Sequence, residues 1–184
     1  GGLRAAAECL RKAAELAGGS THHWCWLNLA NAHLRMQELA LASAGEAGVA
    51  GDPAGDLVLA AEYCDKALVA LDEAAAAGGA GGVAGAGAGG DGWVAGAQQD
   101  PAHERKVALL FKANALHRTG DIAVQSGDSM AEAVMAEAEA LLHEALAVDA
   151  QYYEAHSELG AMLVKSQRYD EARHHLDSAL AICA

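Results

Sequence analysis

The stretch from Tyr152 to Ile182, YYEAHSELGAMLVKSQRYDEARHHLDSALAI, decides the fold. Its apolar and small residues recur every three or four positions in two segments, which a polar turn separates. This period is typical of amphipathic helices. Gly160 and Ala172 fall where one helix would lie on the other, and small residues there allow two backbones to approach closely. The stretch therefore predicts a hairpin of two short helices.

The second helix of this hairpin carries a pattern that recurs along the chain. It is A-x3-L-x2-A, formed by Ala172, Leu176 and Ala179, which lie on one face of a helix. The surrounding residues are also alike in AAECLRKAAEL, AAEYCDKALVAL, AEALLHEALAV and ARHHLDSALAI. The other copies of the pattern are Ala6, Leu10 and Ala13; Ala60, Cys64 and Ala67; and Ala138, Leu142 and Ala145. We therefore interpret the chain as an array of sequence repeats.

The first helix of the hairpin recurs as well. Two of its copies, NLANAHLR and FKANALHR, share the tripeptide Ala-Asn-Ala at the same offset. The matching positions are His156, Leu159, Gly160 and Leu163; Trp26, Leu29, Ala30 and His33; and Leu109, Lys112, Ala113 and Leu116. With the second helices, they predict seven repeat helices.

At these residues the chain resembles the tetratricopeptide repeat family. Its unit is a helix-turn-helix of about 34 residues with W-x2-L-G-x2-Y in the first helix and A-x3-F in the second. The resemblance covers almost all of the chain outside the insertions, and Lys112 departs from it because the family has Leu there. It implies an all-α fold, a right-handed α-solenoid of helix-turn-helix repeats with long loop insertions. The alternative is a bundle of unrelated alanine-rich helices.

Spacing within the repeats locates the insertions. Gly160 and Ala172 are 12 residues apart, whereas the equivalent positions are 30 and 25 residues apart in the two preceding hairpins. A third insertion consists of low-complexity Gly and Ala around Trp93, and we interpret it as a flexible loop. We interpret Trp93 as a surface side chain of that loop. The predicted organisation is the second helix of a truncated first repeat at 3–18, a repeat at 21–77 with an insertion near 43–55, a Gly/Ala-rich flexible loop at 78–99, a repeat at 100–149 with an insertion near 121–129, and the last repeat at 151–184.

Local signals mark the predicted helix borders. The Asp100-Pro101 pair is typical of an N-cap followed by proline in the first turn, and Gly120 suits a helix end. Ser129 and Glu132 have the spacing of a capping box. The Asp-Pro pair in GVAGDPAGD is interpreted as part of a loop. Because the first repeat lacks its first helix and no capping helix follows, we expect a fragment of a longer repeat protein.

Composition restricts the classes of partner and compartment. The net charge is −13 and the sequence pI is near 4.9, which disfavours nucleic acid and anionic membranes as partners. The four cysteines are far apart and form no CxxC pair, so we expect a reducing intracellular compartment. The cytoplasm is the first expectation, and a cilium or an organelle is the alternative. No apolar run approaches the roughly 18 residues of a membrane span, so we expect no membrane insertion.

No motif for catalysis or metal binding stands out. The nine histidines include no HExxH arrangement, and His174 and His175 would point about 100° apart on a helix. GxSxG and GxxxxGK[ST] are also missing from the sequence. We therefore expect no enzyme activity, no catalytic or metal-binding residues and no cofactor.

The resemblance implies a groove. In the tetratricopeptide family the first helices line the concave side of the array and hold an extended peptide or a partner helix. The matching residues offer amides to a peptide backbone, an apolar patch and an acidic end, which implies a ligand with apolar and basic residues. They are Leu27, Asn28, Asn31, Leu110, Phe111, Asn114, Glu154 and Glu158. The alternative is that the apolar members pack on neighbouring helices and the asparagines are solvated.

The functional hypothesis is a non-enzymatic interaction scaffold or adaptor within a larger multiprotein assembly. Its partners would include other segments of the same longer chain. Two alternatives stay open: a regulatory or substrate-recruiting segment of a larger enzyme, and self-association through the ends of the array. Binding of an acidic chaperone tail is disfavoured, because Leu27, Glu154 and Glu158 occupy positions where positive charge would be needed.

Overall fold

The computed structural model is all-helical over the residues that it describes, which are 2–16, 23–42, 52–78 and 100–183. This confirms the all-α prediction. The helices are α1 (Gly2–Leu16), α2 (His23–Ala42), α3 (Pro53–Gly78), α4 (Pro101–Ser126), α5 (Ala131–Val148), α6 (Tyr153–Lys165) and α7 (Tyr169–Cys183). Most of the predicted Gly/Ala-rich loop, with Trp93, lies outside the described residues.

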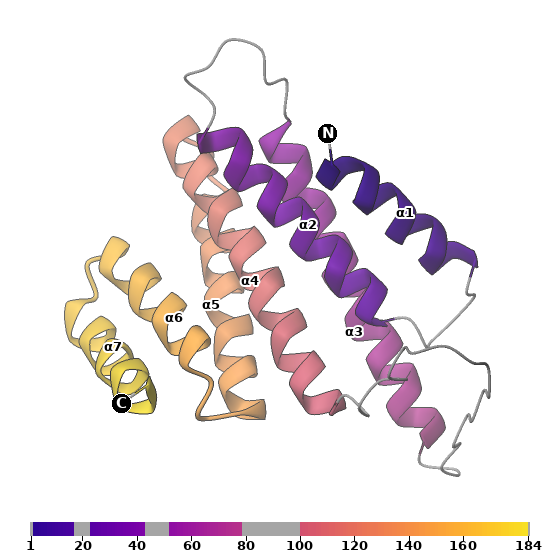
Figure 1. Ribbon diagram of the computed structural model, residues 1–184. Coiled ribbons are helices and arrows are strands. Elements are labelled where there is room, and N and C mark those ends of the chain that lie inside the picture. The colour runs from indigo at the N-terminus through magenta and orange to yellow at the C-terminus, as the bar shows by residue number, and fades with distance from the viewer. Residues whose placement is uncertain (1, 17–22, 43–51, 79–99, 184) are drawn as a thin grey trace.

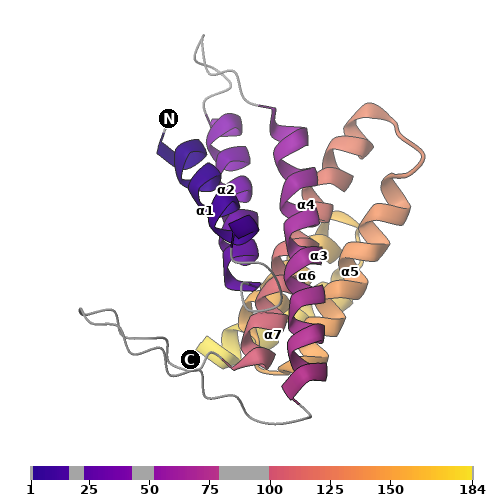
Figure 2. The same ribbon diagram turned by 90° about the vertical axis from the view of Figure 1, so that its right-hand side faces the viewer.

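Each helix packs against the next one in the chain. Figure 1 shows them following one another across the molecule, with the two termini at opposite sides, and Figure 2 shows the arrangement after a quarter turn. We refer to α2–α3, α4–α5 and α6–α7 as the first, second and third helix pairs. Within each pair the two helices make the most extensive contacts of the fold.

Aspartate caps open two of the long helices. Asp100 precedes α4, and its Oδ1 accepts a hydrogen bond from the Ala102 amide at 3.0 Å, as the Asp-Pro signal predicts. Asp52 does the same before α3, where its Oδ1 accepts from the Gly55 amide at 3.0 Å. The second Asp-Pro pair therefore begins a helix, and its interpretation as part of a loop was wrong.

The end of α4 lies farther along the chain than predicted. Gly120 is buried inside α4, where it faces Met135 of α5, and the helix continues to Ser126. Gly127 ends the helix instead, with a φ of 72° that favours glycine. Much of the insertion predicted near 121–129 thus lengthens α4, because the added residues continue its helical hydrogen bonding.

The capping box predicted at Ser129 and Glu132 is not what precedes α5. Met130 is the N-cap of that helix, and its side chain makes no capping hydrogen bond. Asp128 supplies the turn, because its Oδ1 accepts from the Met130 amide at 2.9 Å. An aspartate two residues before the N-cap therefore takes the role predicted for the serine.

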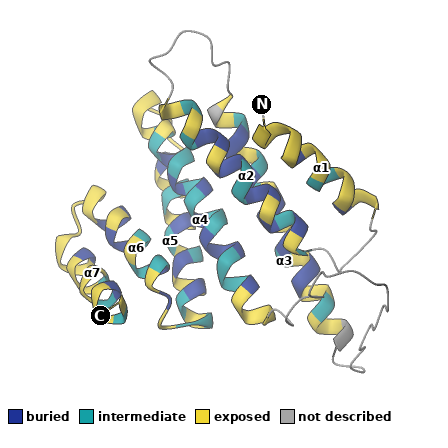
Figure 3. Cartoon of the chain, viewed as in Figure 1, coloured by how far each residue is buried: buried dark blue, intermediate teal, exposed yellow. Residues whose placement is uncertain are grey.

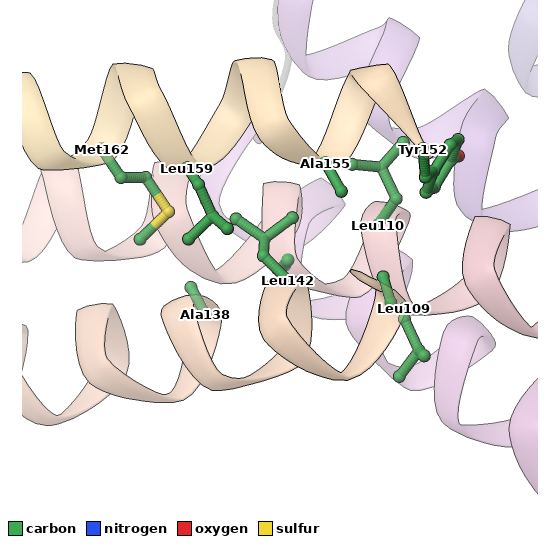
Figure 4. Packing of buried hydrophobic residues seen from close by; sticks show 10 residues of the cluster. Leu109, Leu110, Ala138, Leu142, Tyr152, Ala155, Leu159 and Met162 are labelled. Carbon is green, nitrogen blue, oxygen red and sulfur yellow. The ribbon is translucent and has the colours of Figure 1, made fainter. Parts of the chain in front are cut away.

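The core is built from leucines beside small residues. Between α4, α5 and α6, Leu142 and Leu159 are enclosed with Ala138 and Ala155, as Figure 4 shows. The side of each central helix that faces its neighbours is buried, whereas α1 and α7 are largely exposed (Figure 3). Alanine at the contacts lets the backbones approach, and leucine fills the space beside them.

Most of the predicted repeat-packing residues lie in these contacts. Leu10 and Trp26 are half-buried, and Leu176 is 37% exposed although it packs on Gly160. The buried members are Leu29, Ala30, Ala60, Cys64, Ala67, Ala113, Ala138, Leu142, Ala145, Leu159, Gly160, Ala172 and Ala179.

The face of α1 that packs against α2 differs from the predicted one. Ala6 and Ala13 are exposed, and Ala7 and Ala14 are buried in their place. A shift of one residue turns the buried face by about 100°. Among the described helices, the backbone of α1 lies close to that of α2 alone, whereas each helix from α2 to α6 has at least two such neighbours that fix its rotation.

Lys112 departs from the repeat pattern for a visible reason. Its stem is largely buried in the second helix pair, and its ammonium reaches Asp65 of α3 at 2.8 Å and Glu137 of α5 at 3.5 Å. The lysine thus covers apolar surface with its methylene groups while its charge is paired at the edge. It replaces leucine without leaving a buried, unpaired charge.

Candidate functional site

The helices α2, α4 and α6 form one face of the molecule. The backbone of α4 lies close to those of both α2 and α6, whereas the backbones of α1, α3, α5 and α7 do not approach one another as closely in the described part of the chain. We call the face formed by α2, α4 and α6, whose backbones are the more closely spaced, the inner face. The predicted groove residues all lie on these helices.

Two of the three apolar groove residues lie in the core. Leu27 is 7% exposed and packs against Ala67 and Ala108. Leu110 is 6% exposed and packs against α6 near Ala155 (Figure 4). Both side chains fill the space between adjacent first helices, so their assignment to an open apolar patch was wrong.

Phe111 is half-buried and joins two parts of the core. It packs against the cluster around Leu29 and Ala30, and also against the cluster around Leu34 and Leu57. These contacts tie α4 to both helices of the first pair. Phe111 therefore serves packing between the pairs rather than an exposed patch.

The asparagines remain accessible on the inner face. Asn28 is exposed, and its Nδ2 donates to the Trp24 carbonyl at 2.8 Å. Asn31 and Asn114 occupy equivalent positions in successive pairs and are half-buried. Neither makes a side-chain hydrogen bond to any residue that the structure describes. Each amide can thus donate and accept toward a ligand.

Basic residues recur beside these asparagines. Arg35, Arg118 and Lys165 stand four residues after Asn31, Asn114 and Ala161, at equivalent positions of the three pairs. Arg118 donates to Gln37 Oε1 and Glu38 Oε1, both at 2.7 Å, and so joins α4 to α2. Lys165 reaches Asp121 at 2.6 Å and His117 Nε2 at 3.0 Å, which joins α6 to α4. Charged groups therefore bridge all three inner helices.

The predicted acidic end lies within this basic row. Glu154 and Glu158 are half-buried on α6. Burial raises the pKa of the Glu158 carboxyl, against the opposing effect of Arg118 and Lys165. The inner face is thus mixed in charge, and it brings together Arg118 and Glu158, which lie 40 positions apart in the sequence.

Two histidine–carboxylate pairs with buried carboxylates were missed in the sequence. His23 Nε2 pairs with Glu104, which joins the starts of α2 and α4, and His33 Nδ1 lies 2.9 Å from Asp56 Oδ1. Burial raises the pKa of Glu104, and the nearby His23 opposes that effect. No three His, Cys, Asp or Glu side chains of the described residues converge as a metal site requires.

The four cysteines are free and differ in exposure. Cys9 and Cys183 are exposed, whereas Cys25 and Cys64 are buried, and burial raises the pKa of the Cys64 thiol to about 12. The thiolate is the nucleophile that attacks Ellman's reagent. We therefore expect Cys64 to react at least roughly a hundredfold more slowly than Cys9. Urea should abolish the difference. Equal rates in the folded protein would contradict the burial of Cys64.

Comparisons with known proteins assign no family. Neither a scan against protein-family models nor a search of curated proteins returns a match for this chain. Separately, no helix in the described ranges has both the length and the hydrophobicity that a lipid bilayer requires.

Proposed function

We propose that the chain is a non-enzymatic protein-interaction scaffold that binds a partner along the inner face of α2, α4 and α6. The observation that carries this proposal is the row formed by Asn31 and Asn114. Two side-chain amides at equivalent positions of successive pairs are free of hydrogen bonds to other described residues. Such amides can hold the backbone of an extended segment or the polar side of a helix.

The arrangement expected from the tetratricopeptide resemblance is part of this proposal. A right-handed α-solenoid would place its first helices on the concave side. The close approach of the α4 backbone to those of α2 and α6, which the backbones of the odd-numbered helices do not match in the described ranges, supports that curvature. The repeated small residues at the helix contacts support it as well.

The burial of Leu27 and Leu110 restricts the kind of partner that the inner face could bind. With both side chains in the core, the predicted apolar patch offers a ligand little surface. A polar segment with charges of both signs fits better, because Arg118, Lys165 and Glu158 lie together there. The adaptor role therefore rests on hydrogen bonds and paired charges.

Photo-crosslinking in cells that express the chain tests the proposal. A photoreactive amino acid at position 114 samples the inner face, and the same group at Val69 of α3, which is 56% exposed, samples the outer side. We expect crosslinks to one or a few partner proteins from position 114 and few from position 69. The double variant Asn31→Ala/Asn114→Ala should fold normally as a full-length chain. It should nevertheless recover less of the same partner proteins.

Three outcomes would count against the adaptor role. Equal capture from both positions would remove the preference for the inner face. Crosslinks only between copies of this chain would favour self-association. Undiminished recovery with the double variant would remove the asparagine row from the proposed site, even if partners were captured.

A further inference from the structure

Four histidines from three helices meet at the third helix pair. The ring of His175 in α7 lies 5.2 Å from that of His156 in α6 and 5.9 Å from that of His143 in α5, centroid to centroid. His174 lies 5.5 Å from His175 by the same measure. We call these four residues the histidine cluster. Nothing in the proposed groove function uses them.

The equivalent positions of the other pairs hold groups that cannot become charged in mild acid. In the first pair, Trp26 and Tyr63 stack at 5.8 Å with an interplanar angle of 13°. In the second pair, Leu109 and Leu141 belong to one apolar cluster. His156 and His175 occupy the same places in the third pair. A contact that is insensitive to pH elsewhere in the molecule is therefore titratable here.

The hydrogen bonds fix how the cluster holds its protons. His156 Nδ1 and His175 Nδ1 are 2.9 Å apart, and His156 Nε2 lies 3.3 Å from the Ala150 carbonyl. A carbonyl only accepts, so in the neutral ring Nε2 carries the proton and Nδ1 accepts from His175. The pair can share one added proton. A second would set two N–H groups and two positive charges against each other.

The surrounding carboxylates are already engaged. Glu139 of α5 lies 3.9 Å from His143, but both of its oxygens accept from Arg168 at 2.8 Å. Glu171 of α7 accepts from the same guanidinium at 2.6 and 2.8 Å. Burial lowers the pKa of His175, and so do His156, His143 and His174, whereas Glu171 has the opposite effect. Little free negative charge remains to offset a protonated cluster.

We propose that the histidine cluster makes the docking of α7 on α6 depend on pH, so that the third helix pair loosens in mild acid. When the third helix pair is unfolded, His175 binds a proton as pH falls through about 6.5, the ordinary pKa of histidine, whereas in the folded pair burial and the neighbouring histidines lower the pKa of His175 and delay that binding. Stability of the pair is therefore complete above that pH and is lost below it. Each withheld proton changes the opening equilibrium roughly tenfold per pH unit.

Hydrogen exchange of the α7 amides tests this, expressed as protection factors that correct for intrinsic exchange at each pH. Between pH 7 and pH 5 we expect protection in α7 to fall at least roughly tenfold. The double variant His156→Leu/His175→Leu copies the Leu109 and Leu141 contact and should show a nearly constant value. His175→Tyr, which copies Tyr63, serves if the double variant packs poorly. His103→Gln removes an exposed histidine outside the cluster and should behave like the parent chain.

Two results would overturn the proposal. One is constant α7 protection in the parent chain across this pH range. The other is a fall of the same size in both cluster variants, which would place the titrating groups elsewhere. Neither result bears on partner binding by the inner face, so the two proposals can fail separately.

Discussion

Replacing Phe111 by alanine should destabilise the chain by about 3 kcal/mol, at the lower end of the range for a buried phenylalanine because the ring is half-buried. Phe111 touches the clusters around Leu29 and around Leu57, so its removal leaves a cavity at the contact of α4 with the first pair. Urea unfolding followed by circular dichroism measures this loss. In a thermal scan the midpoint should fall by roughly 6–10 °C.

A matched substitution on the same helix serves as the control. Val124 is 62% exposed in α4, and Val124→Ala should change the free energy of unfolding by less than about 0.5 kcal/mol. Phe111→Leu should recover much of the loss, because most of the apolar volume returns. If Phe111→Ala cost less than about 1 kcal/mol and instead weakened partner binding, Phe111 would belong to the interaction surface after all.

The contacts within a helix pair could be predicted from the sequence. Small residues such as Ala60, Ala138 and Ala172 recur at the same position of the A-x3-L-x2-A pattern because two helices of one hairpin must approach closely, and this requirement acts over a short stretch of chain. The exception is α1, where Ala7 replaces Ala6 in the contact. Adjacent alanines in AAAECL leave the sequence with nothing to distinguish the two registers.

The contacts between pairs could not be predicted in the same way. Asn28, Phe111 and Glu158 occupy one repeat position, yet the first is exposed while the other two are half-buried. Burial at that position depends on how closely the next first helix approaches, and residues far apart in the chain set this distance. The predicted apolar patch failed for this reason, whereas the asparagine positions lie on the open side.

The histidine cluster illustrates a signal that was present but unused. His156 and His175 are 19 residues apart, so helical spacing alone does not connect them. The repeat alignment does, because it places them over Trp26 and Tyr63, two aromatic residues that would also be expected to meet. The side-chain chemistry at equivalent positions of the repeat therefore predicts this pair from the sequence.

The second large effect is expected at Gly160, where α6 lies against Leu176 of α7. A Cβ atom built there would lie 2.6 Å from both Cγ and Cδ2 of Leu176 and 3.5 Å from the Ala172 carbonyl oxygen. Leu176 is 37% exposed and can turn outward for one methyl group, so Gly160→Ala should be nearly neutral, with helix propensity offsetting the contact. Gly160→Leu adds three further carbons against backbone that cannot yield, and should cost about 2 kcal/mol or more.

The neighbouring residue supplies the control for this prediction. Ala161 is exposed on α6, so Ala161→Leu adds a side chain of the same size one position along without entering the contact with α7. Urea unfolding should place Ala161→Leu within about 0.5 kcal/mol of the parent chain. Loss of hydrogen-exchange protection in Gly160→Leu should begin in α7, because the added volume separates that helix first. Equal stability of the two leucine variants would mean that α6 and α7 do not approach through Gly160, and the repeat interpretation of the small residues would lose its physical basis.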